Sequence, residues 1–227
     1  MQRLTQDWER RATSLKGSEV PRLGVNAATI FRLLLRYSNW CRRRRNAPGL
    51  KLFLDGQGQY TETILELLPV AADRSLLGYH RKMENAFPDY CLICDELLAL
   101  PSPERTRIAC FVSDLHRAVG RRFRFAEMGL YLGNYHKTPF GVHVDGCGVI
   151  SFPVVGRKSF KVWSPRKGRP RADSGSQRLA ATPREAVYWP STYWHIAESK
   201  GDFSATWSLG FWIKARRGQR RRSWIFP

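Results

Sequence analysis

The chain has 227 residues, of which 38 are Lys or Arg and 19 are Asp or Glu, so its formal net charge is +19. With 43% hydrophobic and 12% aromatic residues it can fill a core, which excludes an intrinsically disordered chain. The length fits one large domain, or one domain with an appendage. No apolar stretch approaches the length of a transmembrane helix, so no membrane partner is expected.

The compartment is predicted from the N-terminus and the cysteines. Residues 1–16 are charged throughout and lack the apolar segment of a signal peptide, so we expect a cytoplasmic protein with reduced thiols. Cys91 and Cys94 have the spacing of a metal-binding or redox pair, but no second such pair follows. They lie in an apolar run over 90–100 with helical periodicity, and we interpret them as core thiols of a helix.

The first half of the chain is predicted to be mainly helical. An apolar stripe predicts a helix over 26–40, which is followed by a short strand over 51–54. Two more helices are expected over 61–68, with Thr61 as the N-cap, and over 103–119.

From Phe123 onward, short apolar and aromatic runs alternate with Gly, Pro and Asn, a pattern typical of a β-sandwich or barrel. The predicted strands are 123–132, 141–145, 149–155, 159–163, 186–189, 195–198 and 204–214. Residues 164–182 are rich in Arg, Gly, Pro and Ser and are predicted to be a flexible loop. We therefore expect a helical segment over 1–122 that buttresses the barrel, a β core over 123–215 and a basic tail over 216–227.

Two of the five histidines lie in surroundings that suggest a metal site. His143 and Asp145 are two residues apart in an extended segment, so their side chains should point to the same face. A turn at Pro190 would bring His195 to the same place. Two histidines and one carboxylate form the facial triad of non-haem Fe(II), which leaves adjacent positions open for a co-substrate and O2. The His-x-Asp pair alone is weak evidence, because it recurs by chance.

Lys158 adds a second observation, because it lies at the expected start of a strand that neighbours this segment. A buried lysine without a partner is costly and tends to lose its proton. A dicarboxylate co-substrate would supply that partner. The alternative from spacing alone is a solvated lysine in a Gly-Arg-Lys turn.

Three blocks occur in this order along the chain: TPFGVHVD at 138–145, GRK at 156–158 and YWPSTYWHIAES at 188–199. Together they resemble the JmjC/cupin-type hydroxylases, and most of all the hypoxia-factor asparaginyl hydroxylase and bacterial cupin-like hydroxylases. The resemblance covers about residues 123–214. It implies a mainly β protein with N-terminal helices and a double-stranded β-helix (jelly-roll) core.

The same resemblance implies an Fe(II)- and 2-oxoglutarate-dependent dioxygenase that uses O2. It makes His143, Asp145 and His195 the iron ligands and the catalytic centre. Lys158 would bind the distal carboxylate of 2-oxoglutarate.

A hydroxyl group beside the metal site often assists in this family, and Thr138 is the candidate. However, Thr138 lies five residues before His143, whereas the relatives have the hydroxyl three before, where this chain has Phe140. Tyr131 on the preceding strand is the alternative donor. Gly210 stands where some relatives have Asn, so that polar contact is expected to be missing or supplied from elsewhere.

The expected reaction is hydroxylation of a C–H bond in a peptide or protein side chain, because the similar-looking relatives act on polypeptides. Three alternatives stay open: a small amino-acid-derived metabolite, a tRNA nucleoside, and a non-catalytic cupin that only binds. Phosphate contacts of RNA would suit the basic clusters at 42–45, 166–171 and 216–222. The positive field should attract an acidic peptide, RNA or an anionic co-substrate.

Overall fold

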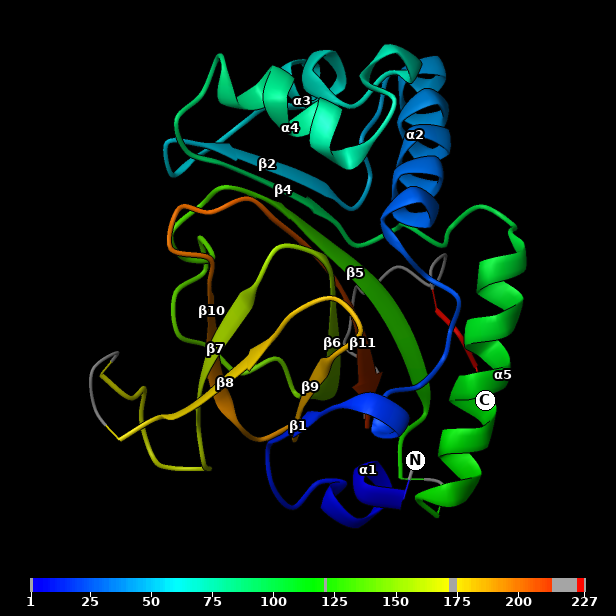
Figure 1. Ribbon diagram of the computed structural model, residues 1–227, viewed down its shortest axis with the longest axis vertical. Coiled ribbons are helices and arrows are strands. Elements are labelled where there is room, and N and C mark those ends of the chain that lie inside the picture. The colour runs from blue at the N-terminus through cyan, green and yellow to red at the C-terminus, as the bar shows by residue number, and fades with distance from the viewer. Residues whose placement is uncertain (1, 121, 172–174, 214–223, 227) are drawn as a thin grey trace.

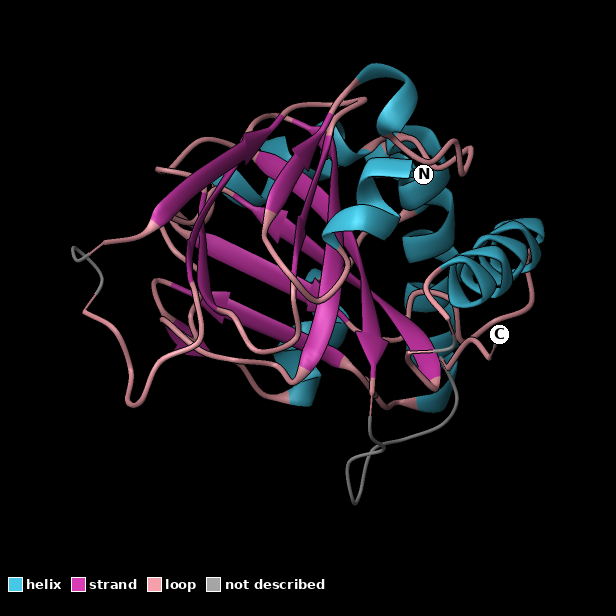
Figure 2. Cartoon of the chain, turned by 90° about the horizontal axis from the view of Figure 1, so that it is seen from below, coloured by secondary structure: helices cyan, strands magenta, loops and turns pink. Residues whose placement is uncertain are grey.

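The strands pair into two antiparallel sheets that face each other as a double-stranded β-helix, or jelly roll, which confirms the predicted fold class (Figure 2). The structure is a computed structural model and describes residues 2–120, 122–171, 175–213 and 224–226. Within the described residues, no helix combines the length and apolar character that crossing a bilayer requires.

The larger sheet has eight strands and the smaller one has three. In spatial order, the larger sheet consists of β1 (Thr13–Leu15), β9 (Ala186–Trp189), β6 (Cys147–Val155), β11 (Ser204–Trp212), β5 (Phe125–Gly133), β4 (Tyr90–Cys94), β2 (Leu50–Leu54) and β3 (Gln57–Gly58). The smaller sheet consists of β10 (Trp194–Glu198), β7 (Lys158–Trp163) and β8 (Gln177–Ala181). The long pairs of β11 with β5 and β6 form the centre of the larger sheet.

Helices cover the outer face of the larger sheet (Figure 1). They are α1 (Gln2–Asp7), α2 (Ala27–Arg44), α3 (Thr61–Leu67), α4 (Leu76–Glu84) and α5 (Pro103–Ala118), with short 3-10 helices η1 (Gly17–Glu19) and η2 (Ala71–Asp73). The helices α2, α3 and α4 lie over β2 and β4, and α5 runs beside β5 (Figure 1). The main hydrophobic core fills the space between these helices and the sheet, and a smaller core lies between the two sheets.

Three of the four predicted helices of the first half, those over 26–40, 61–68 and 103–119, are confirmed with small changes at their ends. Asn26 caps α2, since its side chain accepts a hydrogen bond of 2.9 Å from Thr29 N. Thr61 is the first helical residue of α3, and Tyr60 holds the N-cap position predicted for Thr61.

Residues 90–100 do not form the predicted helix. Tyr90–Cys94 is instead the buried strand β4, which pairs with β2 and β5. All five of its residues are buried, so both faces are apolar, and periodicity alone cannot separate such a strand from a buried helix. Cys91 and Cys94 lie on opposite faces of the sheet in two different clusters, and both are free thiols as expected.

Two further predictions of local structure are wrong. Residues 141–145 form a loop with a single β-bridge at His143 rather than a strand. The predicted loop 164–182 contains the strand β8, whose pairing with β7 supplies the hydrogen bonds that its polar sequence does not reveal. Residues 1–122 also contribute β1 to β4 to the larger sheet. The division of the chain into a helical segment, a β core and a basic tail stays a prediction. Lys214, at the end of a predicted strand, and the basic residues 216–222 lie outside the described residues.

The turn that leads from β6 into β7 generates a stability prediction. Gly156 has φ +68°, and a Cβ atom there would lie 2.2 Å from the backbone oxygen of Phe203. Gly156→Ala should therefore lower the free energy of unfolding by about 2 to 4 kcal/mol, measured by urea denaturation. Gly168 is the control: its φ is +76° but nothing lies within 4 Å, so Gly168→Ala should cost about 1 kcal/mol. Equal losses in the two variants would contradict the steric reason.

Candidate metal centre and its cavity

Reciprocal backbone hydrogen bonds bring the two candidate histidines together. The N–H of His143 donates to the carbonyl oxygen of His195 at 3.0 Å, and the N–H of His195 donates back at 2.9 Å. This bridge joins the loop after residue 140 to β10, and it places the two imidazole rings 4.3 Å apart between their centroids. The predicted convergence of His143 and His195 is therefore present, although His143 lies in a loop rather than a strand.

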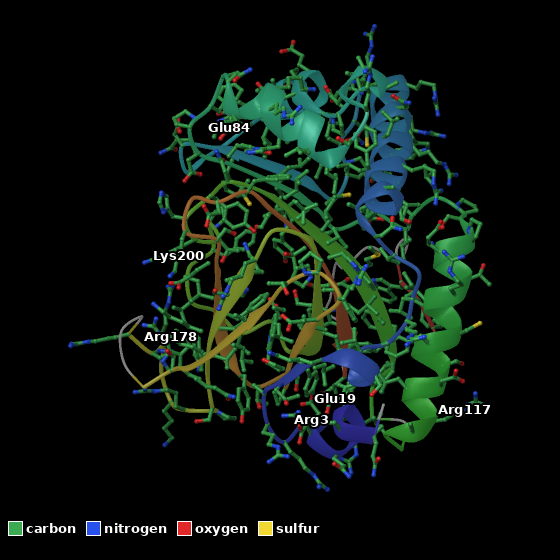
Figure 3. All side chains as sticks on the ribbon, viewed as in Figure 1. Arg3, Glu19, Glu84, Arg117, Arg178 and Lys200 are labelled. Atoms are coloured by element: carbon green, nitrogen blue, oxygen red, sulfur yellow. The ribbon has the colours of Figure 1, made fainter. Side chains whose placement is uncertain are left out.

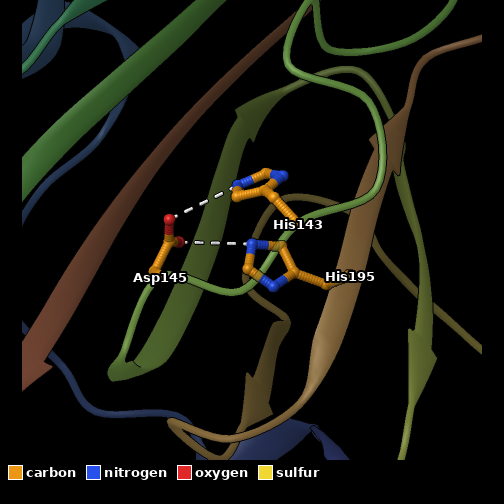
Figure 4. Close-up of side chains that lie close together, drawn as sticks. All are labelled: His143, Asp145 and His195. Atoms are coloured by element: carbon orange, nitrogen blue, oxygen red, sulfur yellow. Dashed lines mark ion pairs between the residues drawn. The ribbon is translucent and has the colours of Figure 1, made fainter. Parts of the chain in front are cut away.

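Asp145 faces both rings (Figure 4). Its Oδ1 lies 3.4 Å from Nε2 of His143, and its Oδ2 lies 3.2 Å from Nε2 of His195. One nitrogen or oxygen atom from each of the three residues lies within 4.8 Å of the others, close enough to share one metal ion. Two imidazoles and a carboxylate on one side leave the opposite side open, as the facial triad requires.

The other nitrogen of each ring fixes which atom is free to bind a metal. Nδ1 of His143 lies 2.9 Å from the carbonyl oxygen of Gly141, and Nδ1 of His195 lies 3.4 Å from that of Tyr193. Since a carbonyl only accepts, each Nδ1 carries a proton. Each Nε2 is therefore the ring atom left to bind a metal ion, in exchange for the proton that it donates to the ionised Asp145. Metal-binding histidines commonly have such a second hydrogen bond, so the donor set fits a divalent cation.

The charge state of the three side chains suits a cation as well. Burial raises the pKa of Asp145, but the hydrogen bonds with His143 and His195 lower it more, so the net pKa lies well below its usual value. Burial lowers the pKa of His143, and the hydrogen bond and charge of Asp145 raise it to a value above normal. Asp145 is therefore an ionised, half-buried carboxylate, where a metal ion would take the place of the imidazole protons as its partner.

A cavity of about 660 Å³ lies between the two sheets and opens beside the triad. Strands β5, β6, β7 and β11 supply its walls, and His143, Asp145 and His195 lie among its lining residues. Three more predicted site residues, Lys158, Thr138 and Tyr131, line the same cavity. Its size is in the range of small-molecule sites.

Lys158 is the charged group deepest in this cavity, because its exposed fraction is 1%. Its Nζ donates to the hydroxyl of Tyr135 at 2.6 Å and to that of Ser199 at 2.5 Å, and it lies 3.9 Å from the centroid of the Tyr135 ring. Ser199 is held in turn by Ser204 at 2.8 Å. No carboxylate of the described residues forms an ion pair with Lys158, and burial lowers its pKa from 10.5 to about 7. The predicted buried lysine is present, and its partners are neutral hydroxyls.

Two hydroxyl groups of the cavity lining have no hydrogen-bond partner in the part of the chain that the structure describes. These are Oγ1 of Thr138 and Oγ1 of Thr206, both buried and both in residues that line the cavity. Buried hydroxyls are normally hydrogen-bonded, so this pair fits a polar ligand between them. The backbone N–H of Thr138 donates to Ala197 O at 3.0 Å, which explains how a residue five positions before His143 reaches the cavity.

Sequence reasoning missed part of this polar set. Tyr135 is fully buried, and its hydroxyl accepts a hydrogen bond from Lys158. Neither Ser199 nor Thr206 carries a recognisable sequence signal, because their role depends on the pairing of β10 and β11 with their neighbours. Phe140 lies at the opening of the cavity, 39% exposed, with its ring edge-on to His143.

The basic cluster at 42–45 lies at the C-terminal end of α2. Arg42 donates hydrogen bonds to the carbonyl oxygens of Leu65, Leu68 and Pro69, so it joins α2 to the end of α3. Exposed arginines such as Arg117 and Arg178 lie at opposite sides of the molecule (Figure 3). The predicted contacts of residues 216–222 with an acidic partner concern residues outside the described ranges.

Comparison with protein-family models gives no match, and comparison with curated protein sequences gives none. Solved structures do match. The ribosomal oxygenase YcfD from Escherichia coli aligns in complex with cobalt and succinic acid at a TM-score of 0.56, and with cobalt and 2-oxoglutarate at 0.54. Both alignments have 13% sequence identity and cover 96% of this chain and 52% of the YcfD chain. This chain has the fold of that oxygenase. It spans about half the length of YcfD, and at this identity the likeness concerns the fold alone.

The triad geometry predicts divalent-metal binding that depends on Asp145. Asp145→Ala should weaken Co²⁺ affinity by about 100-fold or more, because it removes the charged ligand. The measurement is titration with Co²⁺ followed by calorimetry and by visible absorption. His136→Ala is the matched control, since His136 is exposed and lies outside the triad, and it should bind as the wild type does. Unchanged affinity in Asp145→Ala would contradict the ligand assignment.

The buried lysine predicts a pH-dependent stability. Because burial lowers the pKa of Lys158 from 10.5 to about 7, the unfolded chain binds more protons than the native one between these values. This group's contribution to stability therefore rises with pH across that window, by on the order of 3 kcal/mol. Lys158→Met should remove this rise. The measurement is the free energy of unfolding in urea at pH 7 and at pH 9.5, and the change between the two pH values is compared in variant and wild type. Lys137→Met, at an exposed position, should leave it unchanged.

Proposed function

We propose that the protein is an Fe(II)- and 2-oxoglutarate-dependent dioxygenase that hydroxylates a C–H bond in a peptide or protein side chain, and that it acts in the cytoplasm. The main support is the content of one cavity. It contains a triad of two histidines and one carboxylate, and it contains a buried lysine that has no carboxylate partner among the described residues. A metal ion fits the first feature, and the far carboxylate of a short dicarboxylate fits the second.

The strand register separates the two features by a suitable distance. His195 pairs with Val162 on β7, and Lys158 lies four residues before Val162 on the same strand. At about 3.3 Å per residue, Lys158 therefore lies about 13 Å from the level of His195, measured along the strands. The side chain of Lys158 and a five-carbon dicarboxylate, placed end to end, would span this gap.

The chain's own residues prepare the site for these ligands. His143, Asp145 and His195 would hold the metal, and Lys158, Thr138 and Thr206 would donate hydrogen bonds to the dicarboxylate. Fe(II), when bound with 2-oxoglutarate and O2, would supply the oxidation of the C–H bond while the co-substrate is converted to succinate and CO2. The remaining task of the protein is to orient the target carbon and to keep water from the reacting atoms.

The walls of the cavity support this exclusion of water. Val149, Phe160 and Trp189 line it and are buried, and the ring of Trp189 lies 4.9 Å from that of His195. A tightly packed apolar wall beside the metal position strengthens electrostatic contacts inside the cavity. Tyr131 lines the β5 side and would face the substrate or co-substrate.

A polypeptide substrate is proposed because the structural neighbour is described as a ribosomal oxygenase. The opening of the cavity carries charges of both signs, from Lys51, Asp95 and Glu127, and the first two form an ion pair of 2.9 Å. Local charges at the opening, rather than the net charge of +19, would therefore select the substrate side chain.

Turnover of labelled 2-oxoglutarate tests the activity. With Fe(II) and ascorbate, the wild type should release labelled succinate and CO2, and Asp145→Ala should release none above background. Lys158→Met should raise the KM for 2-oxoglutarate by at least about tenfold, because a charge-assisted hydrogen bond is lost. The affinity of the wild type should fall as pH rises above about 7, since burial lowers the pKa of Lys158 to about 7 and binding needs its charged form.

Candidate peptides, tRNA and free amino acids incubated with the active protein should be searched by mass spectrometry for an added oxygen atom. Oxygen addition to a peptide supports the proposed substrate class, and addition to tRNA or a free amino acid would replace it. Wild-type protein that holds Fe(II) but neither binds nor turns over 2-oxoglutarate would overturn the proposed activity.

A further inference from the structure

A second cavity, of about 720 Å³, lies on the outer face of the larger sheet. The segment 16–26 forms one side of it, the turn 183–185 forms another, and residues of β6 and β11 form its floor. The metal centre lies on the inner side of the same two strands. The volume is within the range of sites for small organic ligands, and the proposed oxygenase reaction gives this groove no role.

The floor of this groove is aromatic. Phe152 of β6 and Trp207 of β11 are directly paired across the strands, with ring centroids 4.3 Å apart and planes inclined by 13°. Three prolines, Pro21, Pro153 and Pro183, add rigid apolar surface around this pair. Such a surface favours an apolar, aromatic group, because burial of apolar area and contacts between aromatic rings both contribute to binding.

Trp207 also offers a polar contact that the described residues leave unused. Its side chain is 98% buried, since the exposed fraction of the residue is 2%, and its Nε1 has no hydrogen-bond partner among them. An indole N–H can only donate, and a buried donor without an acceptor destabilises the protein. A ligand for this groove should therefore carry a hydrogen-bond acceptor.

The charges around the groove indicate the sign of the ligand's charge. Lys16, Arg22 and Arg184 line it, and among the described lining residues Glu185 is the acidic one. Glu185 already accepts hydrogen bonds of 2.9 Å from the N–H and the hydroxyl of Thr182, and it forms an ion pair of 3.4 Å with Lys16. The groove is thus left with the exposed guanidinium groups of Arg22 and Arg184, which match an anion.

The backbone at Arg184 is unusual for an arginine. Residues 182–185 form a turn closed by a hydrogen bond of 3.0 Å from Glu185 N to Thr182 O, with Pro183 in its second position. Arg184 occupies the third position with φ +76°, where glycine is normally preferred. The chain therefore places a cationic side chain beside the groove at a position where glycine would have the lower backbone energy.

We propose that this groove is a second binding site, and that its ligand is a small aromatic carboxylate whose ring packs on Phe152 and Trp207. The carboxylate pairs with Arg22 and Arg184, and one of its oxygens accepts the hydrogen bond from the Trp207 indole. The inference does not depend on the oxygenase activity, because none of these residues lines the metal-site cavity.

The test uses 4-phenylbutyrate as the probe and 4-phenylbutyramide as its neutral match. Indole N–H signals of the eight tryptophans are followed by ¹H–¹⁵N NMR, and Trp207→Phe assigns the signal of Trp207. The acid should bind at least about tenfold more tightly than the amide and should move the Trp207 signal downfield. Arg22→Gln and Arg184→Gln should each weaken binding by about three- to tenfold, and the exposed Arg178→Gln should not.

Two further variants separate this site from a general structural effect. Arg184→Gly should raise the urea midpoint of unfolding, because it relieves the positive φ, and at the same time weaken probe binding. Lys158→Met should leave probe binding unchanged, because Lys158 lies in the other cavity. Equal binding of acid and amide, an unmoved Trp207 signal, or weakened binding in Lys158→Met would overturn the proposal.

Discussion

The reciprocal hydrogen bonds between the backbones of His143 and His195 are the interaction on which the candidate site depends. They bind a loop that has no regular structure of its own to β10, the edge strand of the smaller sheet. Without this bridge, the backbone would not position Asp145 opposite two imidazoles at once. The side-chain geometry follows from it: each Nδ1 is engaged by a carbonyl two residues earlier, and each Nε2 therefore faces the carboxylate.

Lys158 places a second constraint on the molecule. A buried ammonium group surrounded by neutral hydroxyls opposes folding, and the lowered pKa is the measure of that opposition. An anionic ligand would reverse the balance, because it supplies the missing charge in a place where water is excluded. The same buried ammonium group that opposes folding would therefore strengthen the binding of an anionic ligand, a conflict typical of functional sites.

The strand pattern of the second half, the convergence of the triad and the burial of the lysine could be predicted from the sequence. Each depends on local spacing or on a residue type with few structural uses. The sequence did not reveal that 90–94 is a strand, since a run that is apolar on both faces has no usable period. It also gave no sign of the contact between Tyr135 and Lys158, of Thr206 or of β8, because these depend on which strands become neighbours. Thr138 lines the cavity although its spacing from His143 differs from that of the relatives, and its backbone hydrogen bond to Ala197 holds it there; its role in binding stays a prediction.

The strands β6 and β11 connect the outer core with the inner cavity. Along β11, Thr206 and Ser208 face the metal-site cavity, while Trp207 between them faces outward and stacks on Phe152. Along β6, Ser151 lines the inner cavity beside that same Phe152, and its hydroxyl accepts a hydrogen bond of 2.9 Å from Ser208. Because neighbouring side chains on a strand share one backbone, the aromatic stack outside fixes the positions of the hydroxyls inside. Apolar packing on the outer face of the sheet thus holds the polar wall of the cavity in place. Polar groups alone would fix the positions of these hydroxyls less well.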